Sequence, residues 1–279
     1  MGLELLRPPG ALPLLVGHRG ACDCAPENTL VSFQRAVADG VDVVELDVRR
    51  TADGHVVALH DERVDRTTDG EGFIAELTLA EAQRLDAGTW FAPQFAGARI
   101  PTLAEVFEWA RGRVGLMLEL KYGFTGGFDP HLVPAIVALI REHAIADQVV
   151  FISYWGRGFE QLHALLPGMR AGPLTPQTRG THWAVWLTRR FPGLGRAAPV
   201  RRALLAPLDL TRQMRGTMAS PNIEVVTPTL VAAAHAAGMP VSAGGFAWDY
   251  PAALAMGVDT VSSNDPGVVR RRYLRERRM

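Results

Sequence analysis

The 279-residue sequence predicts an α/β fold, namely a (β/α)8 TIM barrel with a β-hairpin and long excursions at the C-terminal mouth. Short β-branched runs alternate with stretches of helical periodicity, which is typical of a parallel sheet. Eight such runs fit one barrel, and barrels of this length routinely form a single domain. A ninth run follows the second too closely for a parallel crossover, which needs roughly a dozen residues. We therefore expect one barrel domain over residues 1–279.

The expected strands are short and mostly apolar. They are Leu14–Gly17, Val43–Val48, Gly115–Leu120, Val149–Ser153, Arg170–Leu174, Asn222–Val226, Val241–Gly244 and Thr260–Ser263. Helical stretches lie between most of them, at Thr29–Asp39, Leu103–Arg113, Pro130–His143, Phe159–Leu166, Leu230–Ala237 and Pro251–Met256. Asn28 is expected to cap the first helix, and Thr102 with Glu105 has the pattern of a capping box before the second.

The ninth run, Val56–His60, is separated from the second strand only by TADG and His55. We expect the two runs to pair antiparallel, which folds His60 back over the end of the second strand. Residues 61–100 then form one long excursion before the second helix. Active sites of such barrels lie at the C-terminal ends of the strands, so the residues at these ends are the first candidates for function.

Composition narrows the class of protein. The formal net charge is zero, which gives no sign of a nucleic-acid partner, and none is expected. Cys22 and Cys24 are too close in sequence for a probable structural bridge, which favours a reduced, cytoplasmic location. The apolar run near the N-terminus is broken by prolines and does not read as a signal peptide. The sequence has no apolar run of about 18 residues or more, as a membrane-spanning helix would need.

Three acids stand in strands that are otherwise apolar. Glu45 and Asp47 are two residues apart in VVELDV, so their side chains share one face of a strand. Glu119, in LMLEL, supplies a third carboxylate. Acids are costly to bury unpaired, and oxygen ligands suit Mg²⁺ or Ca²⁺ rather than zinc. We expect a divalent metal site here; the alternative is salt bridges to Arg49 or Arg50.

Two histidines and one lysine complete the candidate chemistry. His18 and His60 end two different apolar runs, an arrangement that suits an acid and a base on opposite sides of a substrate. A lone histidine is more often structural, but two beside motif carboxylates or arginines favour catalysis. The chain has 28 arginines and a single lysine, Lys121, which directly follows the strand of Glu119. We expect Lys121 to act at the site.

The motifs resemble those of the glycerophosphodiester phosphodiesterase family. The resemblance rests on HRG (18–20), APENT (25–29), VELDVRRTADG (44–54), VVALHD (56–61), DRTTDGEG (65–72), IPTLAEVF (100–107), LELK (118–121) and GVDTVSSNDP (257–266). It implies that His18 and His60 are catalytic. It also implies that Arg19 binds the phosphate through its planar fork, unless the fork pairs with Glu27 or a metal-site acid. Glu27 is expected to support the site or to contact a substrate hydroxyl.

One stretch departs from the family pattern. Members usually carry a tryptophan–threonine pair on the seventh strand, where the tryptophan walls the substrate. Here Gly244 and Gly245 stand at that place, within VSAGGFAWDYP. Phe246 or Trp248 from the next turn is expected to fill the gap. The wall of the substrate site is therefore expected to differ from that of other members, while the groups that carry the chemistry are the same.

The resemblance implies metal-dependent hydrolysis of a glycerophosphodiester to glycerol 3-phosphate and an alcohol. We assign His18 to the nucleophile and His60 to the leaving group, although sequence alone does not fix that order. The nearer alternative is lysophospholipase D-type cleavage of a lysophospholipid, because the sphingomyelinase D enzymes are similar in arrangement. The farther alternative is a catalytically silent barrel that binds polyol phosphates. The expected partner is a small-molecule or lysolipid phosphodiester.

A second excursion, residues 173–220, has an unusual composition. It carries eight arginines and one acid, Asp209, with tryptophan and leucine residues interleaved in WAVWLTRRF and VRRALLAPL. This composition is typical of an interfacial amphipathic segment that binds anionic lipid. One hypothesis is peripheral membrane contact through residues 173–220. The alternative is an ordinary packed cap whose arginines are solvated or paired with acids of the barrel.

Overall fold

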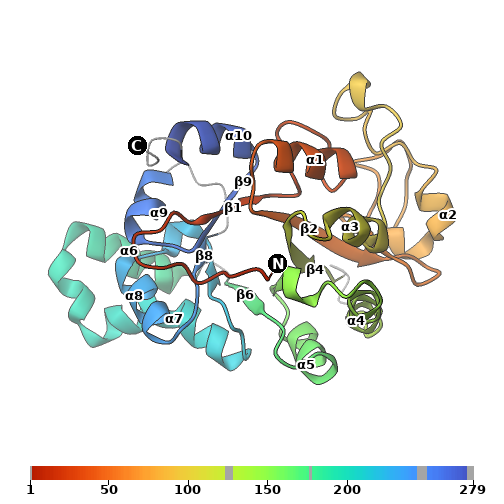
Figure 1. Cartoon of the computed structure of the whole chain (residues 1–279). Helices are drawn as coiled ribbons and strands as arrows, with labels where there is room; N and C mark the ends of the chain where they lie inside the picture. Colours follow the sequence, from red (N-terminus) through yellow and green to blue (C-terminus); the bar gives the residue numbers. More distant parts are fainter. Residues whose placement is uncertain (1, 123–127, 176–177, 244–249, 275–279) are drawn as a thin grey trace.

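The computed structural model describes residues 2–122, 128–175, 178–243 and 250–274, and it shows a nearly closed parallel barrel (Figure 1). The barrel strands are β1 (Leu14–Gly17), β2 (Val43–Arg50), β4 (Gly115–Leu120), β5 (Val149–Ser153), β6 (Ala171–Thr175), β7 (Ser220–Pro221), β8 (Ser242–Ala243) and β9 (Thr260–Ser263). Their order is β7-β6-β5-β4-β2-β1-β9-β8. A parallel bridge between Ala219 and Val241 joins the two ends. The predicted (β/α)8 fold is confirmed.

The predicted hairpin is confirmed as well. Strand β3 (Val56–Ala58) pairs antiparallel with the end of β2, with Val48 opposite Ala58 and Arg50 opposite Val56. The backbone N–H of Leu59 then donates to the carbonyl of Asp47 at 3.0 Å. This bond carries the hairpin one residue beyond β3, so His60 follows directly at the edge of the barrel mouth.

Helices cover the outside of the barrel. They are α1 (Leu30–Ala38), α3 (Leu103–Ala110), α4 (Leu132–His143), α5 (Gly156–Leu165), α8 (Pro228–Ala236), α9 (Tyr250–Met256) and α10 (Pro266–Val269), with short helical turns η3 (Ala146–Gln148), η5 (Ile223–Val225) and η6 (Arg270–Leu274). Helix α3 begins with the predicted capping box of Thr102 and Glu105. Leu46, Leu118 and Phe151 from the strands are fully buried together with Phe33 and Phe107 from the helices. No described helix has both the length and the apolar character needed to cross a bilayer.

Two excursions leave the barrel. Residues 61–100 contain the short turns η1 (Ile74–Glu76) and η2 (Pro93–Phe95) and the helix α2 (Leu79–Ala82). They enclose a small apolar cluster of Val57, Leu59, Val64, Ile74, Ala82, Ala87 and Ile100. The second excursion contains α6 (Arg179–Arg190), the turn η4 (Pro192–Arg196) and α7 (Ala198–Gln213). Figure 1 shows it projecting beyond the barrel wall.

Two local predictions were wrong. The strand expected at Asn222–Val226 is instead the two-residue β7 followed by η5, because Pro221 lacks an amide donor and the side chain of Asn222 accepts from the N–H of Glu224 at 2.9 Å. Asn28 does not cap the first helix. Thr29 is the N-cap and accepts from the N–H of Ser32, while Asn28 adopts a left-handed backbone with φ 55°.

Candidate active site

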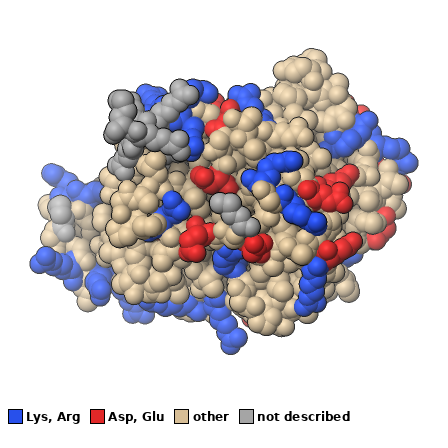
Figure 2. Space-filling view, viewed as in Figure 1, with Lys and Arg blue, Asp and Glu red and all other residues tan. Residues whose placement is uncertain are grey.

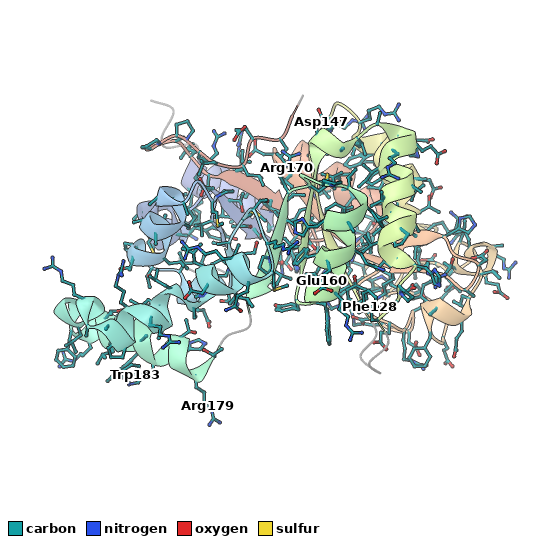
Figure 3. All side chains as sticks on the ribbon, turned by 90° about the horizontal axis from the view of Figure 1, so that it is seen from below. Phe128, Asp147, Glu160, Arg170, Arg179 and Trp183 are labelled. Atoms are coloured by element: carbon teal, nitrogen blue, oxygen red, sulfur yellow. The ribbon has the colours of Figure 1, made fainter. Side chains whose placement is uncertain are left out.

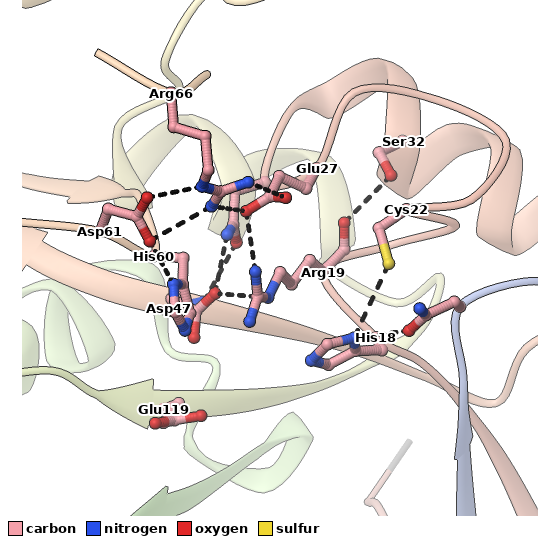
Figure 4. Close-up of polar contacts among 12 residues, drawn as sticks. His18, Arg19, Cys22, Glu27, Ser32, Asp47, His60, Asp61, Arg66 and Glu119 are labelled. Carbon is pink, nitrogen blue, oxygen red and sulfur yellow. Dashed lines mark hydrogen bonds and ion pairs between the residues drawn. The ribbon is translucent and has the colours of Figure 1, made fainter. Parts of the chain in front are cut away.

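A cavity of about 300 Å³ opens at the C-terminal ends of the barrel strands. Its acidic and basic lining residues are His18, Arg19, Glu45, His60, Glu119 and Lys121. They come from the ends of β1 and β2, from the segment after β3, and from β4 and the residue that follows it. Asp47 lies beneath Arg19 and Lys121 and is 1% exposed. Figure 4 shows His18 and His60 on opposite sides of Arg19. The strand ends thus bring together groups separated by up to 103 residues of sequence.

The turn after β1 holds Arg19 in an unusual conformation. Its φ is 49°, in the left-handed region that non-glycine residues seldom adopt. In this position the backbone N–H donates to Glu45 Oε2 at 2.8 Å. The guanidinium reaches Glu27 at 2.9 Å and Asp47 at 3.3 Å. The pairing that the sequence left as an alternative for Arg19 is therefore present in the structure, in which Arg19 also lines the cavity.

The three predicted carboxylates converge. Glu45, Asp47 and Glu119 each offer an oxygen within 4.8 Å of the others. Burial and the charges of Asp47 and Glu119 raise the pKa of Glu45 well above its ordinary value. Burial also raises the pKa of Glu119, again with help from Asp47. The neighbouring cations therefore do not fully offset the negative charge of the three carboxylates. Glu45 Oε1 is buried and finds no hydrogen-bond partner among the described residues, so the three carboxylates fit a hard divalent cation held by carboxylate oxygens.

The only lysine of the chain lies among these acids. Lys121 Nζ is 3.1 Å from Asp47 Oδ1 and also contacts Glu119 Oε1. Burial opposes the charge on the ammonium, but Asp47 and Glu119 outweigh it and raise the pKa of Lys121. Asp47 is buried too, yet Lys121, Arg19 and His60 hold its pKa well below the ordinary range. Asp47 therefore remains a carboxylate at any ordinary pH.

His18 faces an amide. Its Nδ1 lies 2.7 Å from Asn264 Oδ1, and the orientation of that amide is supported by a bond from Asn264 Nδ2 to Asp23 at 3.2 Å. An amide oxygen accepts, so His18 Nδ1 carries the proton and Nε2 is the basic nitrogen. Burial lowers the pKa of His18, and the charge of Arg19 lowers it further. The ring is therefore neutral near pH 7. Cys22 Sγ also lies 3.7 Å from Nδ1.

His60 faces a carboxylate. Its Nδ1 lies 2.6 Å from Asp61 Oδ1, and its backbone carbonyl accepts two bonds from the Arg49 guanidinium, at 2.7 and 2.9 Å. Burial lowers the pKa of His60, whereas Asp47 and Asp61 act in the opposite direction. Asp61 itself has its pKa lowered to about 2, despite burial, by Arg66 and His60. The two histidines thus differ in the group that holds Nδ1.

A further ion-pair network joins the two sides of the site. Glu27 is not part of the cavity lining; it accepts from Arg19 and, at 2.7 and 2.8 Å, from Arg66. The same Arg66 reaches Asp61 at 2.6 Å. Arg66 therefore ties the carboxylate behind His60 to the carboxylate behind Arg19 (Figure 4).

Sequence reasoning missed four residues of this arrangement: Asn28, Asp61, Arg66 and Asn264. Asn28 Nδ2 donates to Asp47 at 2.8 Å, and its Oδ1 accepts from the Asp47 N–H at 3.1 Å. All four stand within motifs that carry the family resemblance, and Asn264 directly follows the last strand. Their positions within these motifs were the sequence signal that could have identified them as site residues. The expected wall residues Phe246 and Trp248 lie outside the described residues; the described apolar lining is Met117, Ile152, Tyr154, Leu174 and Pro221.

Comparison with known proteins decides the family. The model of the glycerophosphoryl diester phosphodiesterase family matches residues 18–268. The chain belongs to this family. A glycerophosphodiester phosphodiesterase from Caldanaerobacter subterraneus is 41% identical over 162 residues, which is 58% of this chain and 66% of that protein. One from Bacillus subtilis is 34% identical over 167 residues, 56% of this chain and 57% of that protein. The aligned segments thus span less than two thirds of these family members.

Solved structures of the glycerophosphoryl diester phosphodiesterase family cover more of the fold. A phosphodiesterase from Oleispira antarctica, solved in complex with the product sn-glycerol-3-phosphate, has a TM-score of 0.77 and 28% identity. The match covers 93% of this chain and 96% of that one. A glycerophosphodiester phosphodiesterase from Agrobacterium tumefaciens has a TM-score of 0.72 and 27% identity over 92% of this chain and 98% of that one. The barrel therefore follows the architecture of the family.

Proposed function

We propose that the protein hydrolyses a glycerophosphodiester to sn-glycerol 3-phosphate and an alcohol. The observation that carries the proposal is that His18 and His60 line one cavity together with Glu45, Glu119 and two cationic side chains, and that Asp47 lies beside these two carboxylates. Family membership supports it, as does the similarity to a phosphodiesterase solved with sn-glycerol-3-phosphate. A phosphodiester needs a proton removed from its nucleophile and a proton given to its leaving group, and this cavity offers one imidazole for each.

The proposal includes a divalent metal, Mg²⁺ or Ca²⁺, held by Glu45, Asp47 and Glu119. The unpartnered oxygen of Glu45 and the raised pKa of that buried side chain support this assignment, because a cation would satisfy both. When bound, the metal would supply positive charge that polarises the phosphate and orients the attacking oxygen. Arg19 and Lys121 would add two positive charges beside the non-bridging oxygens and favour the transition state, in which charge gathers on those oxygens.

The neighbours of the two rings favour one division of labour. His18, held in its neutral tautomer by Asn264, is the proposed base toward the nucleophile, with Nε2 receiving the proton. His60, backed by the Asp61 carboxylate, is the proposed acid toward the departing alkoxide, because a carboxylate stabilises the imidazolium. An anionic phosphodiester in the cavity would raise the pKa of both rings. The nucleophile is water or a hydroxyl of the substrate itself.

A second candidate is lysophospholipase D-type cleavage, in which the same groups act on a lysolipid. Two features of the structure support this second candidate. Four apolar side chains, from Met117, Ile152, Tyr154 and Leu174, line the described cavity. In addition, Trp183 and Trp186 of the cap excursion are half exposed or more, as lipid contact requires. A silent phosphate-binding barrel is disfavoured, because such a protein has no need of two histidines.

One experiment separates these candidates. The purified protein is assayed on glycerophosphocholine and on lysophosphatidylcholine, with excess chelator and then with Mg²⁺ or Ca²⁺ restored. Release of sn-glycerol 3-phosphate from the first substrate, abolished by chelator, is the expected result. Choline release from lysophosphatidylcholine, with no cleavage of glycerophosphocholine, would favour the second candidate. Full activity in chelator would refute the metal assignment, and no turnover of either substrate would contradict both candidates for these head groups.

A further inference from the structure

The outer face of the cap excursion carries a stripe of basic and aromatic side chains. Arg179, Trp183, Trp186 and Arg190 succeed one another at helical spacing on α6, so they share one face. We call these four residues the α6 stripe. Trp183 is 50% exposed and Trp186 61% exposed, and both arginines are exposed. Figure 3 shows Arg179 and Trp183 on the side of α6 turned away from the barrel.

The opposite face of α6 is already packed. Ala184 and Val185 are buried with Val200 and Leu204 of α7 in one apolar cluster. The α6 stripe is therefore not needed to hold the cap together. Phe191 and Leu194, in the segment that leads from α6 through η4, extend the exposed apolar surface, at 50% and 42% exposure. Exposed aromatic side chains gathered in this way mark interaction sites rather than ordinary surface.

Charge separates the cap from the rest of the molecule. Eight arginines against Asp209 give residues 173–220 a formal charge of +7, and because the chain is neutral the remainder carries −7. Asp209 is paired with Arg212 at 3.3 Å. Within the described part of the chain, the other seven arginines of the cap have no ion pair with an acid. Figure 2 shows arginines gathered at the end of the molecule that α6 and α7 form, without acids among them.

We propose that the α6 stripe docks the protein on an anionic membrane surface. Tryptophan favours the boundary between headgroups and acyl chains, and the arginine fork pairs with lipid phosphate. The stripe offers two of each, with the arginines at its ends. A second copy of this chain is a poorer occupant, because a two-fold contact through this face would oppose two caps of +7. The proposal does not rest on the proposed reaction.

Docking would bring the cavity toward the lipid. The cap leaves the barrel after Leu174 and Thr175 and returns at Ser220 and Pro221, and all four line the cavity. A membrane held by the α6 stripe therefore lies close to the rim through which a substrate enters. The remainder, with its charge of −7, is repelled by the same anionic surface, so the two halves of the charge distribution favour one orientation.

Vesicle co-sedimentation without substrate tests the proposal. Vesicles of phosphatidylcholine with roughly one third phosphatidylglycerol are compared with phosphatidylcholine alone, at low salt and at about 0.5 M salt. We expect binding to the anionic vesicles only, lost at high salt. Trp183→Ala/Trp186→Ala and Arg179→Glu/Arg190→Glu should each weaken it by about tenfold or more. Circular dichroism verifies that the variants fold.

Control variants carry comparable changes in the other excursion, residues 61–100. Trp90→Ala removes a tryptophan that is 38% exposed, and Arg84→Glu/Arg99→Glu reverses two exposed arginines. Neither control should change vesicle binding. The proposal is overturned if the intact protein ignores anionic vesicles at low salt, or if the stripe variants bind as tightly as the controls. A dimer in analytical ultracentrifugation that only the stripe variants lose would also overturn it, in favour of self-association.

Discussion

Asp47 shows how much one residue organises at this site. Its carboxylate accepts from Asn28 and lies against Arg19 and Lys121, although it is 1% exposed. Three donors offset a burial penalty that no single partner would outweigh. The same cations that keep Asp47 ionised are the ones proposed to meet the phosphate. Arg19 and Lys121 therefore both stabilise the buried carboxylate of Asp47 and, in the proposed reaction, bind the phosphate.

The division of labour between the histidines gives the first prediction. His18→Ala and His60→Ala should each lower kcat by about 10²–10⁴. A nitrophenyl ester has a good leaving group and needs little protonation, so it should restore His60→Ala and not His18→Ala. Steady-state kinetics on both substrates checks this. Equal restoration of the two variants would reverse or abolish the proposed assignment.

The amide beside His18 gives the second prediction. Burial and Arg19 lower the pKa of His18, so kcat/KM should fall with acid only below the ordinary value of 6.5. Asn264→Asp places a carboxylate at Nδ1, which stabilises the imidazolium and raises that pKa. The acidic limb of the pH profile should then move to higher pH. An unmoved limb in Asn264→Asp would contradict the prediction.

Arg66 gives the third prediction. Arg66 bonds both Asp61, the partner of His60, and Glu27, the partner of Arg19. We therefore expect Arg66 to position these two side chains rather than to contact the substrate. Arg66→Ala should lower kcat by about 10–100-fold with little change in KM. Arg63→Ala is the control, because Arg63 pairs with Asp65 at 2.6 Å and lies over the Phe73 ring, both in the same excursion. A loss confined to KM would indicate direct substrate binding instead.

At the scale of elements, α3 carries the clearest local signal. The side chain of Thr102 accepts from the N–H of Glu105 at 3.1 Å, and the Glu105 carboxylate accepts from the N–H of Thr102 at 2.7 Å. Thr102→Ala should therefore lower the free energy of unfolding by about 1 kcal/mol. Thr102→Ser keeps the hydroxyl and should cost less. Urea unfolding of both variants measures the difference, and equal stabilities would show that the cap contributes nothing.

Elements with strong local patterns were predictable from sequence. The apolar strands β2 and β4, the short hairpin connection and the capping box each follow from spacing alone, and the facing of Glu45 and Asp47 follows from the period of a strand. Asn28 and Arg66 were not predictable in this way. Asn28 acts from a left-handed turn, and Arg66 meets Glu27 across 39 residues of chain, so both depend on tertiary contacts. The prediction of a strand at Asn222–Val226 was wrong because Pro221 and Asn222 interrupt the backbone hydrogen bonds of the sheet.

The whole barrel is unevenly closed, which gives the last prediction. Strands β2 and β4 pair over six residues, whereas β7 and β8 have two residues each and meet through the Ala219–Val241 bridge. Opening should start where the ladder is shortest. In hydrogen–deuterium exchange, the amides of Ala219 and Ser242 should exchange faster than those of Met117 and Leu118. Equal protection on both sides of the barrel would show that the seam is as stable as the opposite wall.

Lys121 has a consequence for chemical labelling. Because every other basic side chain except the histidines is an arginine, acylating reagents meet a single ε-amino group, and that group lines the cavity. Its side chain is 15% exposed and is paired with two carboxylates that hold it protonated, so it should acylate slowly. Any ligand or cation that draws those carboxylates away would change this rate. The extent of acylation at Lys121, read by mass spectrometry of the peptide that carries it after digestion, therefore reports on cavity occupancy without any assay of turnover.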